Sequence, residues 1–545
     1  MTIISLESNL VYISAVVVAF TLVVHLIRAT SRWSDAPPGP PTVPILGNLH
    51  QIPQRETSIS STKDGERNVD GPIFSLKLGS QNMIVLTSGE MIKKLVDKRS
   101  GNYADRPKLY MQEVWEHSRI IMRGYDPLWK VERKLYHQFL NINRAARYAP
   151  YQDLETRQLC YDLLHQPGDF EALVTRATTS LATSMTYGFR VVSLESPVMK
   201  ELFANTHGFF VMVRGSKLLD WFPQLRPMAR LLPTWLNGVA RKGKEIFSRE
   251  KAHFHQLYKQ VQVDADLGTA HPSFAADIYT AQKTWKDAAA LDLLTDHAAS
   301  YIAGIALEGG ADTTSNTLAG LIKAMMLFPD VQRKVHEELD AVVGRDRYPT
   351  MDDFQSLPYV RQTVKEALRW LPTAINGAIP HAALADDEID GFKIPAGTNV
   401  VLAVWCANND ARLFPNPREF DPSRHDPSKS LAEAAAAADY KQRDQWTFGA
   451  GRRICPGIHV AERTLFLATA RLLWAFDIRK ARGPDGLEIE VDRDEVTQSI
   501  AARPVPFRCE IKPRSEKHAR LISEAWSQAR EGLDKSGNYK EVAIQ

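Results

Sequence analysis

Cysteine is scarce in this chain, which has only four among its 545 residues. They are Cys160, Cys406, Cys455 and Cys509, and no two have the C-x-x-C spacing of zinc or redox sites. Four cysteines do not make a disulfide framework in a chain of this length, and they favour a reducing compartment. A metal site that needs several cysteine ligands is therefore excluded.

An excess of charge of either sign is also lacking. Lys and Arg number 67, Asp and Glu number 64, and the net charge is +3 with no basic block. This balance argues against nucleic acid as a partner. The chain has no internal repeat and no G-x-G-x-x-G dinucleotide fingerprint. Its 44% hydrophobic and 24% charged residues are typical of a globular protein with a sizeable core.

An apolar stretch lies near the N-terminus, where the eighteen residues Leu10–Ile27 contain no Asp, Glu, Lys or Arg. As a helix this stretch spans about 27 Å, close to the thickness of a thin bilayer. A cleaved signal peptide is the alternative, but it has a shorter apolar region and a basic start. Glu7 precedes the stretch, and Arg28 and Arg32 follow it. We therefore predict a retained anchor, with the rest of the chain on the cytoplasmic side.

The rest of the sequence predicts one large domain, mainly α with a small β region (α+β). Residues 1–34 hold the anchor, and residues 35–48, "DAPPGPPTVPILGN", form a proline-rich hinge whose apolar end docks on the domain. The domain covers residues 49–514, and residues 515–545 form a polar, loosely held tail.

Within the domain, "PIFSLKLGSQNMIVLTS" alternates apolar and polar residues and predicts two strands around a turn at 79–82. Residues 89–343 predict helices, residues 384–406 predict strands and turns, and an apolar run after Cys455 predicts a helix to about Phe476. The segment "LAEAAAAADYKQRD" is expected to be an exposed helical insertion. The Trp- and Leu-rich stretch 218–236 is either packed in the core or dips into a membrane.

One cysteine lies in a loop rich in glycine. "TFGAGRRICPG" has the form F-x-x-G-x-R-x-C-x-G, in which Arg453 precedes Cys455 by two residues. Glycines let a bulky group approach the main chain, and nearby arginines favour a thiolate. A lone cysteine can serve as the single axial ligand of a haem iron, because the porphyrin supplies the other donors. The alternative is a structural cysteine in a turn.

This loop resembles the haem-binding signature of the cytochrome P-450 superfamily. The resemblance implies a cytochrome P-450 fold preceded by a single N-terminal transmembrane helix, so that residues 49–514 form a haem-thiolate monooxygenase domain. It implies haem b whose iron is ligated axially by the Cys455 thiolate, with Arg453 reaching a haem carboxylate. The cofactor-binding residues that it implies within the loop are Phe448, Gly449, Arg453, Cys455 and Gly457.

Three further patterns are similar to motifs of the same family. In "KEALRW", Glu366 and Arg369 share one helix face, and the resemblance implies that Arg424 of "FDPSR" joins them in a buried triad that supports the haem loop. In "WKVER", Trp129 and Arg133 lie four residues apart, where the family contacts a haem propionate.

His381 matches another position at which the family often contacts a propionate. In the segment "WCANNDARLFPNP" the chain departs from the family, because Asn408 and Asn409 stand where histidine and arginine are common.

The third pattern is "EGGADTTSNTL", with two glycines inside an apolar helix. Each glycine costs about 1 kcal/mol relative to alanine, so a function should offset it. Thr313 lies four residues after Gly309, and its hydroxyl can bond the Gly309 carbonyl and open the helix locally. The resemblance implies catalytic roles for Asp312 and Thr313, which deliver protons.

The implied reaction is insertion of one oxygen atom from O2 into an apolar small molecule, in secondary metabolite biosynthesis. Because no nucleotide-binding fingerprint is present, electrons would come from a separate NADPH-cytochrome P-450 reductase, with cytochrome b5 as a second candidate donor. The anchor and its flanks imply an endoplasmic reticulum membrane location with the catalytic domain facing the cytosol. Two alternatives are a haem-thiolate isomerase or dehydratase that acts without O2, and a non-catalytic membrane haem protein.

Overall fold

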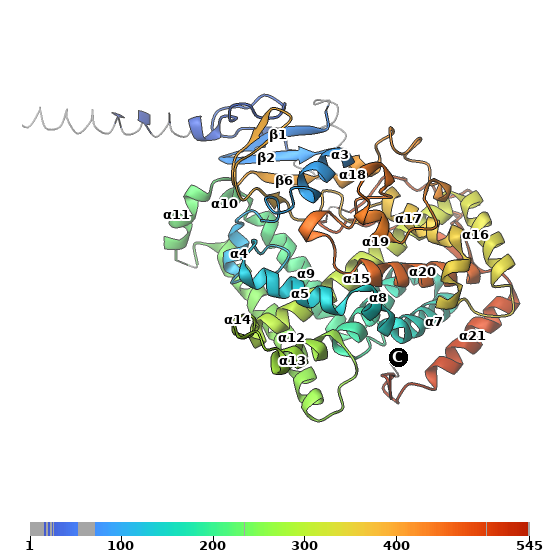
Figure 1. Ribbon diagram of the computed structural model, residues 1–545. Coiled ribbons are helices and arrows are strands. Elements are labelled where there is room, and N and C mark those ends of the chain that lie inside the picture. The colour runs from blue at the N-terminus through green and yellow to red at the C-terminus, as the bar shows by residue number, and fades with distance from the viewer. Residues whose placement is uncertain are drawn as a thin grey trace, which may run out of the picture.

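The computed structural model describes residues 27–52, 71–233, 235–497 and 499–542, with five single positions between 16 and 24. The predicted anchor at Leu10–Ile27 falls mostly outside these residues. In the described part of the chain, no helix combines the length and the apolar character needed to cross a membrane. The expected mainly helical domain with a small sheet region is confirmed (Figure 1).

The main sheet has four strands in the order β1-β2-β6-β3. The two strands predicted around the first turn are present and pair antiparallel from Ile73 opposite Leu86 to Leu78 opposite Gln81. Strand β6 pairs parallel with β2 and brings residues more than 300 positions apart into one sheet. Two further sheets pair β4 with β5 and β7 with β8. The strands are β1 (Ile73–Leu78), β2 (Gln81–Leu86), β3 (His381–Ala382), β4 (Asp387–Ile389), β5 (Phe392–Ile394), β6 (Asn399–Leu402), β7 (Phe476–Lys480) and β8 (Cys509–Pro513).

The proline-rich hinge lies along the free side of β1, as predicted. The Ser75 N–H donates to the Pro38 carbonyl over 2.8 Å, and the Asn48 N–H donates to the Lys77 carbonyl over 2.6 Å. The Asn48 side chain in turn accepts from the Lys77 N–H at 2.8 Å. These bonds fix the hinge to the body of the protein.

Helices make up most of the rest of the domain (Figure 1). They are α3 (Gly89–Ile92), α4 (Tyr110–Val114), α5 (Pro127–Phe139), α6 (Ile142–Ala145), α7 (Ala149–His165), α8 (Phe170–Tyr187), α9 (Pro197–Gly215), α10 (Lys217–Trp221), α11 (Arg226–Leu231), α12 (Gly238–Asp266), α13 (Phe274–Thr284), α14 (Ala288–Leu293), α15 (Asp296–Leu327), α16 (Pro329–Val342), α17 (Pro358–Trp370), α18 (Val404–Asn408), α19 (Leu431–Ala436), α20 (Ile458–Ala475) and α21 (Glu516–Arg530). Helix α20 is the helix predicted after Cys455.

Helix α15 runs through the core. It begins with a cap, since the Thr295 hydroxyl accepts from the Ala298 N–H, and it ends just before Pro329, which cannot continue it. Apolar residues lie on all faces of the helix, and most of its residues are buried, which is typical of a core helix. Polar contacts also join it to α8, where the hydroxyls of Thr175 and Ser315 lie 3.0 Å apart. The helix therefore holds its middle residues at the centre of the domain.

Alanine-rich helix α19 differs partly from the expected exposed insertion. Its start is fixed by a capping box between Ser430 and Glu433. Leu431, Ala434 and Ala435 are buried against the core, so only one face of this short helix is exposed.

The expectation of a loosely held C-terminal tail is wrong for residues 516–542. Helix α21 buries His518, Ile522, Ala525 and Trp526, which lie on one helix face at spacings of four, three and one. Beyond the helix, the Tyr539 hydroxyl donates to the Ser184 hydroxyl over 2.9 Å. The polar composition of the segment conceals this narrow buried face.

We expect Trp526→Ala to lower the free energy of unfolding by about 3 kcal/mol, because a large buried ring is lost from the contact between α21 and α7. Trp235→Ala is the matched control, because Trp235 is 72% exposed and its loss should change stability by less than about 0.5 kcal/mol. Denaturant unfolding of both variants measures the difference. Equal stabilities would show that the C-terminal segment does not support the fold.

Candidate active site

The loop before α20 folds tightly around Cys455. The Cys455 N–H donates to the Phe448 carbonyl over 2.9 Å, which closes the loop. The Gly457 N–H bonds to the Cys455 sulfur and favours its charged form. A Cβ at Gly457 would lie 3.8 Å from this sulfur, so the main chain passes close to it. A backbone N–H group therefore stabilises the charged form of the sulfur.

Two glycines of the loop have left-handed backbones that other residues rarely adopt. Gly449 has a φ of +71° and Gly451 a φ of +62°. A Cβ at Gly451 would lie 2.1 Å from the Val96 carbonyl oxygen. The missing side chain at Gly451 therefore lets the loop pack on the segment before Ser100.

The cation that acts on the sulfur is Arg133, not the arginines that precede Cys455 in sequence. Burial raises the pKa of the Cys455 thiol, while the Gly457 N–H and the charge of Arg133 oppose this shift. Arg452 donates to a tyrosine hydroxyl, and Arg453 donates to main-chain carbonyls. A thiol held protonated by burial gives up its proton when it binds a metal ion.

Helix α5 brings Trp129 and Arg133 to this loop. The Asp126 side chain caps the helix by accepting from the Trp129 N–H at 2.7 Å. Arg133 donates to the Ile454 carbonyl, and the Arg453 guanidinium lies 4.6 Å from the centre of the Trp129 ring. The structure thus brings together three residues that the sequence assigned to haem carboxylates.

Arg453 also ties the loop to the segment between β2 and α5. Its guanidinium donates to the carbonyls of Ala104, Ile120 and Arg123, the last over 2.8 Å. These three bonds use three of its five N–H groups, and two N–H groups remain for other partners.

His381 lies in β3 and is buried. Its Nδ1–H donates to the Tyr103 carbonyl over 2.7 Å, which leaves Nε2 as the free ring nitrogen. Burial, followed by the charges of Arg106 and Arg453, holds the pKa of His381 well below its usual value. A nearby anion would reverse the effect of those charges.

Arg106 belongs to the same cluster, although we did not single it out as a site residue. Burial and the charge of Arg453 hold the pKa of Arg106 well below its usual value. Its Nε is buried and has no hydrogen-bond partner among the described residues. The signal for this residue was the segment "YADRP", which also fits the family resemblance.

These cations fit a haem. Burial lowers the pKa of Arg106, Arg133, Arg453 and His381 alike, and the negative charges near them do not offset this effect. Asp105 is the carboxylate that acts on both Arg106 and Arg453. The two propionates of a haem would supply the missing anions, next to the cysteine that can hold its iron.

Helix α15 contains the predicted threonine contact. The Thr313 hydroxyl donates to the Gly309 carbonyl over 2.6 Å. Gly309, Gly310 and Thr313 are exposed, whereas most residues of this helix are buried. The expected local opening does not interrupt the helix, which continues unbroken through these residues. An accessible surface therefore exists in the middle of a core helix.

Asp312 is half-buried beside this surface. Burial raises the pKa of its carboxyl to about 6, although the charge of Arg503 and a hydrogen bond from Asn316 oppose the shift. A carboxyl with such a pKa can hold or release a proton near neutral pH.

The predicted support of the loop is present. Glu366 and Arg369 are buried and joined by two hydrogen bonds of 2.7 Å, and Arg424 Nε lies 3.2 Å from the same carboxylate. Burial disfavours the charge of Glu366, but bonds from Arg369 and His425 outweigh it and lower its pKa to about 2. The carboxylate is therefore ionised at neutral pH.

Asn408 connects this triad to the cysteine loop, which explains one departure from the family pattern. Its side-chain oxygen accepts from the Trp446 N–H at 2.8 Å, and its side-chain NH2 donates to the Arg369 carbonyl over 3.3 Å. A fully buried amide can both accept and donate, so Asn408 fits this position.

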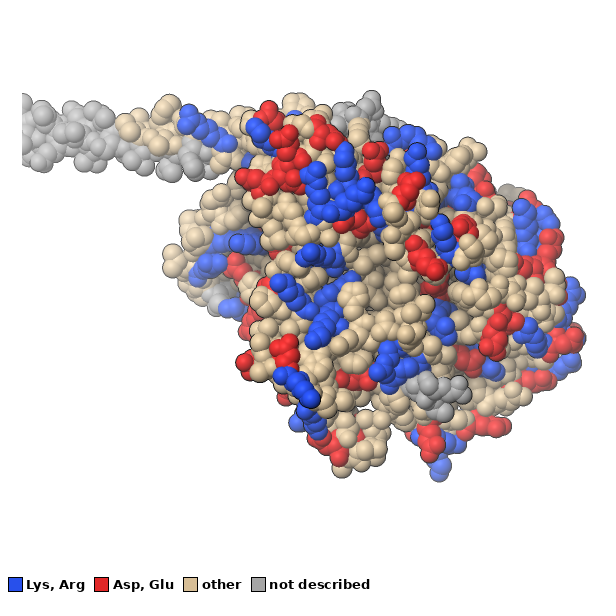
Figure 2. Space-filling model, in the orientation of Figure 1, with Lys and Arg blue, Asp and Glu red and all other residues tan. Residues whose placement is uncertain are grey.

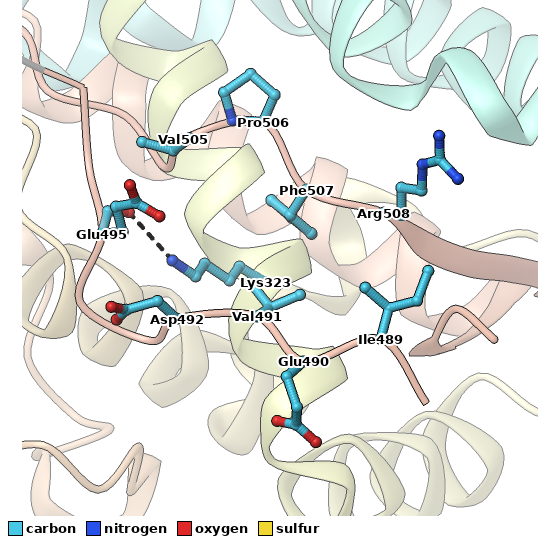
Figure 3. Close-up of a pocket in the computed structure, with 10 residues that line it drawn as sticks. All are labelled: Lys323, Ile489, Glu490, Val491, Asp492, Glu495, Val505, Pro506, Phe507 and Arg508. Carbon is cyan, nitrogen blue, oxygen red and sulfur yellow. Dashed lines mark hydrogen bonds between the residues drawn. The ribbon is translucent and has the colours of Figure 1, made fainter. Parts of the chain in front are cut away.

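A cavity of about 400 Å³ lies beside the C-terminal half of α15 (Figure 3). Lys323 lines it and donates to the Glu495 carbonyl over 3.2 Å, while Val491 and Phe507 form apolar walls. The cavity shares no lining residue with the cysteine loop or with residues 309–313.

Comparison with known proteins places this site in a family. The sequence profile described as "Cytochrome P450" matches residues 37–500. The chain is 40% identical to "Cytochrome P450 monooxygenase fogE" of Aspergillus ruber over 533 residues, covering 96% of both chains. It is 38% identical to "Cytochrome P450 monooxygenase virE" of Hypocrea virens over 531 residues, covering 96% of this chain and 94% of that protein.

A solved structure has the same fold. A zebra fish cytochrome P450 structure with abiraterone matches with a TM-score of 0.63 at 22% identity, covering 82% of this chain and 97% of that chain. Because the sequence relatives and the fold agree with the cation cluster around Cys455, the chain belongs to the cytochrome P450 family and is a haem-thiolate monooxygenase whose haem b iron is bound by a cysteine thiolate.

Proposed function

We propose that the protein inserts one oxygen atom from O2 into an apolar small molecule, with electrons from a separate reductase. The main support for this proposal is the exposed Thr313 hydroxyl on the core helix α15, which donates to the Gly309 carbonyl. The second element is the loop further along the chain that contains Cys455. An isomerase or dehydratase that acts without O2 has no use for such a proton-delivering group.

Cys455, Trp129, Arg133, Arg453 and His381 would hold the haem in this function. When bound, the haem supplies an iron whose thiolate ligand favours cleavage of the O–O bond. The Gly457 N–H keeps negative charge on the sulfur, and the arginines neutralise the propionates. These residues bind and orient the cofactor.

Asp312 and Thr313 would deliver protons. Because the Asp312 pKa is about 6, its carboxyl exchanges protons readily near neutral pH. The Thr313 hydroxyl donates its hydrogen bond to the Gly309 carbonyl. The lone pairs of its oxygen can therefore accept a hydrogen bond from water. Thr313 Oγ is thus the atom that orients a water for proton transfer.

An apolar substrate is supported by side chains from the segments that the sequence predicts to line the pocket, which are residues 107–125, the stretch before Asp312, the residues after Leu371 and the turn near Ile500. One hydrophobic cluster contains Ile305 of α15 and Ile379 before β3, with Ile120, Ile121 and Ile500 packed against it as half-buried residues. These segments include the stretches expected to line the pocket. Half-buried aliphatic groups favour an apolar ligand. Relatives from Aspergillus ruber and Hypocrea virens support a role in fungal secondary metabolism.

Attachment to the endoplasmic reticulum membrane is supported by an apolar surface next to the hinge. Leu231 is 85% and Trp235 is 72% exposed, so the core-packing alternative is wrong for the end of the 218–236 stretch. The Gly79 N–H donates to the Leu46 carbonyl over 3.2 Å and the Ser80 N–H donates to the Trp221 carbonyl over 3.0 Å, which places α10 beside the hinge. Figure 1 shows α10 and α11 on the same side as β1.

A reductase is supported by basic side chains over the cysteine loop. Lys130 and Lys134 of α5 and Arg452 of the loop are exposed. Figure 2 shows Lys and Arg side chains gathered over the face that carries α5. A positive surface at this place would steer an acidic electron donor, such as NADPH-cytochrome P-450 reductase or cytochrome b5.

We expect Thr313→Ala to divert a several-fold larger share of electrons to hydrogen peroxide, because the hydroxyl that orients water is lost. The ratio of hydroxylated product to NADPH consumed measures this coupling. Thr313→Ser should restore it, and Thr317→Ala, which removes a hydroxyl one helical turn further along α15, should leave it unchanged. Unchanged coupling in Thr313→Ala would refute the role of this hydroxyl.

We expect the double variant Lys130→Glu and Lys134→Glu to slow reduction by added reductase about tenfold at low ionic strength. The difference should shrink as salt rises, because exposed charges are screened. Stopped-flow reduction under carbon monoxide measures the rate. Lys512→Glu is the control, since Lys512 is 67% exposed on β8. A rate that is equal in all three proteins would exclude this docking face.

In full-length protein reconstituted into phosphatidylcholine vesicles, a fluorophore on Leu231→Cys should be shielded from an aqueous quencher. The side chain is 85% exposed in the protein and apolar, so the bilayer is its favourable surrounding. Leu487→Cys, at a side chain that is 68% exposed, is the control and should be quenched freely. Equal quenching at both sites would contradict membrane contact of α11.

A further inference from the structure

His425 follows Arg424 directly and is buried against α17. Its Nε2 lies 2.7 Å from Glu366 Oε2, on the carboxylate that also holds Arg369. On its other side, Nδ1 lies 3.5 Å from Asp444 Oδ1. The His425 side chain is 1% exposed, so water does not compete for these contacts. One imidazole therefore stands between two buried carboxylates.

Asp444 connects this histidine to the cysteine loop. It lies two residues before Trp446, whose N–H donates to Asn408. Its second partner is Lys365 of α17, whose Nζ lies 2.8 Å away. Lys365 also donates to the Asp426 carbonyl over 2.6 Å. The start of the loop is thus attached to α17 through charged groups.

Arg443, the residue before Asp444, also holds the start of the cysteine loop in place. It donates to the carbonyls of Gln445 and Gly449, and its guanidinium lies 3.9 Å from the centre of the Trp446 ring. It also lies 3.6 Å from Asp97. Two adjacent charged residues, Arg443 and Asp444, therefore hold the first part of the loop through different partners.

The charge of His425 follows from its partners. A neutral imidazole donates through one nitrogen, whereas an imidazolium donates through both. Burial opposes the charged form, but hydrogen bonding and charge from Asp444 and Glu366 outweigh burial and raise the pKa of His425 above its ordinary value. The cations that face the same groups are Arg369, Arg424 and Lys365.

We propose that His425 is a positioning residue of the haem site, a buried imidazolium that joins the Glu366–Arg369 pair to Asp444 and so fixes the cysteine loop. This extends the support of the loop beyond the two arginines, and it does not depend on the proposed substrate or electron donor. Loss of the proton would leave one ring nitrogen without a hydrogen to donate and would release Asp444.

The charge of His425 makes the stability of the protein depend on pH, and the direction of its pKa shift determines the sign. The pKa of His425 in the folded protein lies above its unfolded value of about 6.5. Its contribution to stability is therefore complete below about pH 6.5 and is lost as pH rises through the raised folded pKa. A loosened loop weakens thiolate ligation, so ligation and stability should fall together at high pH.

The test uses full-length holoprotein and two readouts. The first is the share of the ferrous carbon monoxide complex that shows the strongly red-shifted Soret band of thiolate ligation, and the second is the thermal unfolding midpoint. In wild type, the ratio of shifted to unshifted complex should fall about tenfold per pH unit above the pKa of one group. In His425→Gln, the ratio should be lower at about pH 7 and should lack this step.

His518→Gln is the matched control. His518 is 2% exposed on α21, and its Nδ1 lies 2.8 Å from the Ser515 hydroxyl, far in sequence from the loop. This variant can lower the unfolding midpoint but should keep the wild-type pH step. A His425→Gln protein that keeps the same step, or that differs from wild type only as His518→Gln does, overturns the proposal.

If the His425→Gln protein does not fold, Asp444→Asn provides the test. It removes one of the two negative charges that favour the imidazolium, while Glu366 remains. The pH step of the Soret ratio should then move to lower pH. A step that stays in place shows that the titrating group is not His425, which also overturns the proposal.

Discussion

The structure of the site depends on one fully buried carboxylate, Glu366. Arg369 satisfies it through two bonds, Arg424 and His425 approach from the segment before Asp426, and the Asp421 N–H adds a bond of 2.9 Å. Removing one partner of such a group leaves an uncompensated buried charge, which costs several kcal/mol. The segment 421–425 is thereby held at a fixed position against α17, and the start of the cysteine loop is attached to it through the contact between His425 and Asp444.

A second constraint is the surplus of positive charge beside Cys455. Arg106, Arg133 and Arg453 come from three different segments, and the fold brings them together with little negative charge to balance them. The apoprotein therefore carries an electrostatic cost that an anionic cofactor relieves. Cofactor binding and the final packing of the loop should be coupled, because the same arginines donate to the main chain around the loop.

Local patterns of the sequence predicted their own geometry well. The Thr313 bond to Gly309 and the Glu366–Arg369 pair each join residues within one helical turn, so helix geometry alone determines them. The first two strands and the docking of the hinge were predicted because alternation and proline restrict the chain locally. The fold class and the cysteine ligand followed from one specific motif.

Contacts between distant segments could not be predicted in the same way. His425 meets Asp444 across 19 positions that include the short helix α19, and nothing in either local sequence indicates a partner. Arg106 joins Arg453 across the domain, and its charge looked ordinary in the sequence. Helix α21 was missed because four buried positions are few among polar neighbours. In each case the packing of the whole chain, rather than local preference, decides the structure.

The hinge along β1 has one more consequence. In the sheet order, β1 is an outer strand, and the hinge occupies its backbone groups at Ser75 and Lys77 while Gly47 pairs with Leu78. An uncovered outer strand is a template for pairing with another molecule. The prolines that cover it cannot themselves extend the ladder, so the hinge protects the protein against self-association, and shortened versions that lack residues 35–48 would lose this protection.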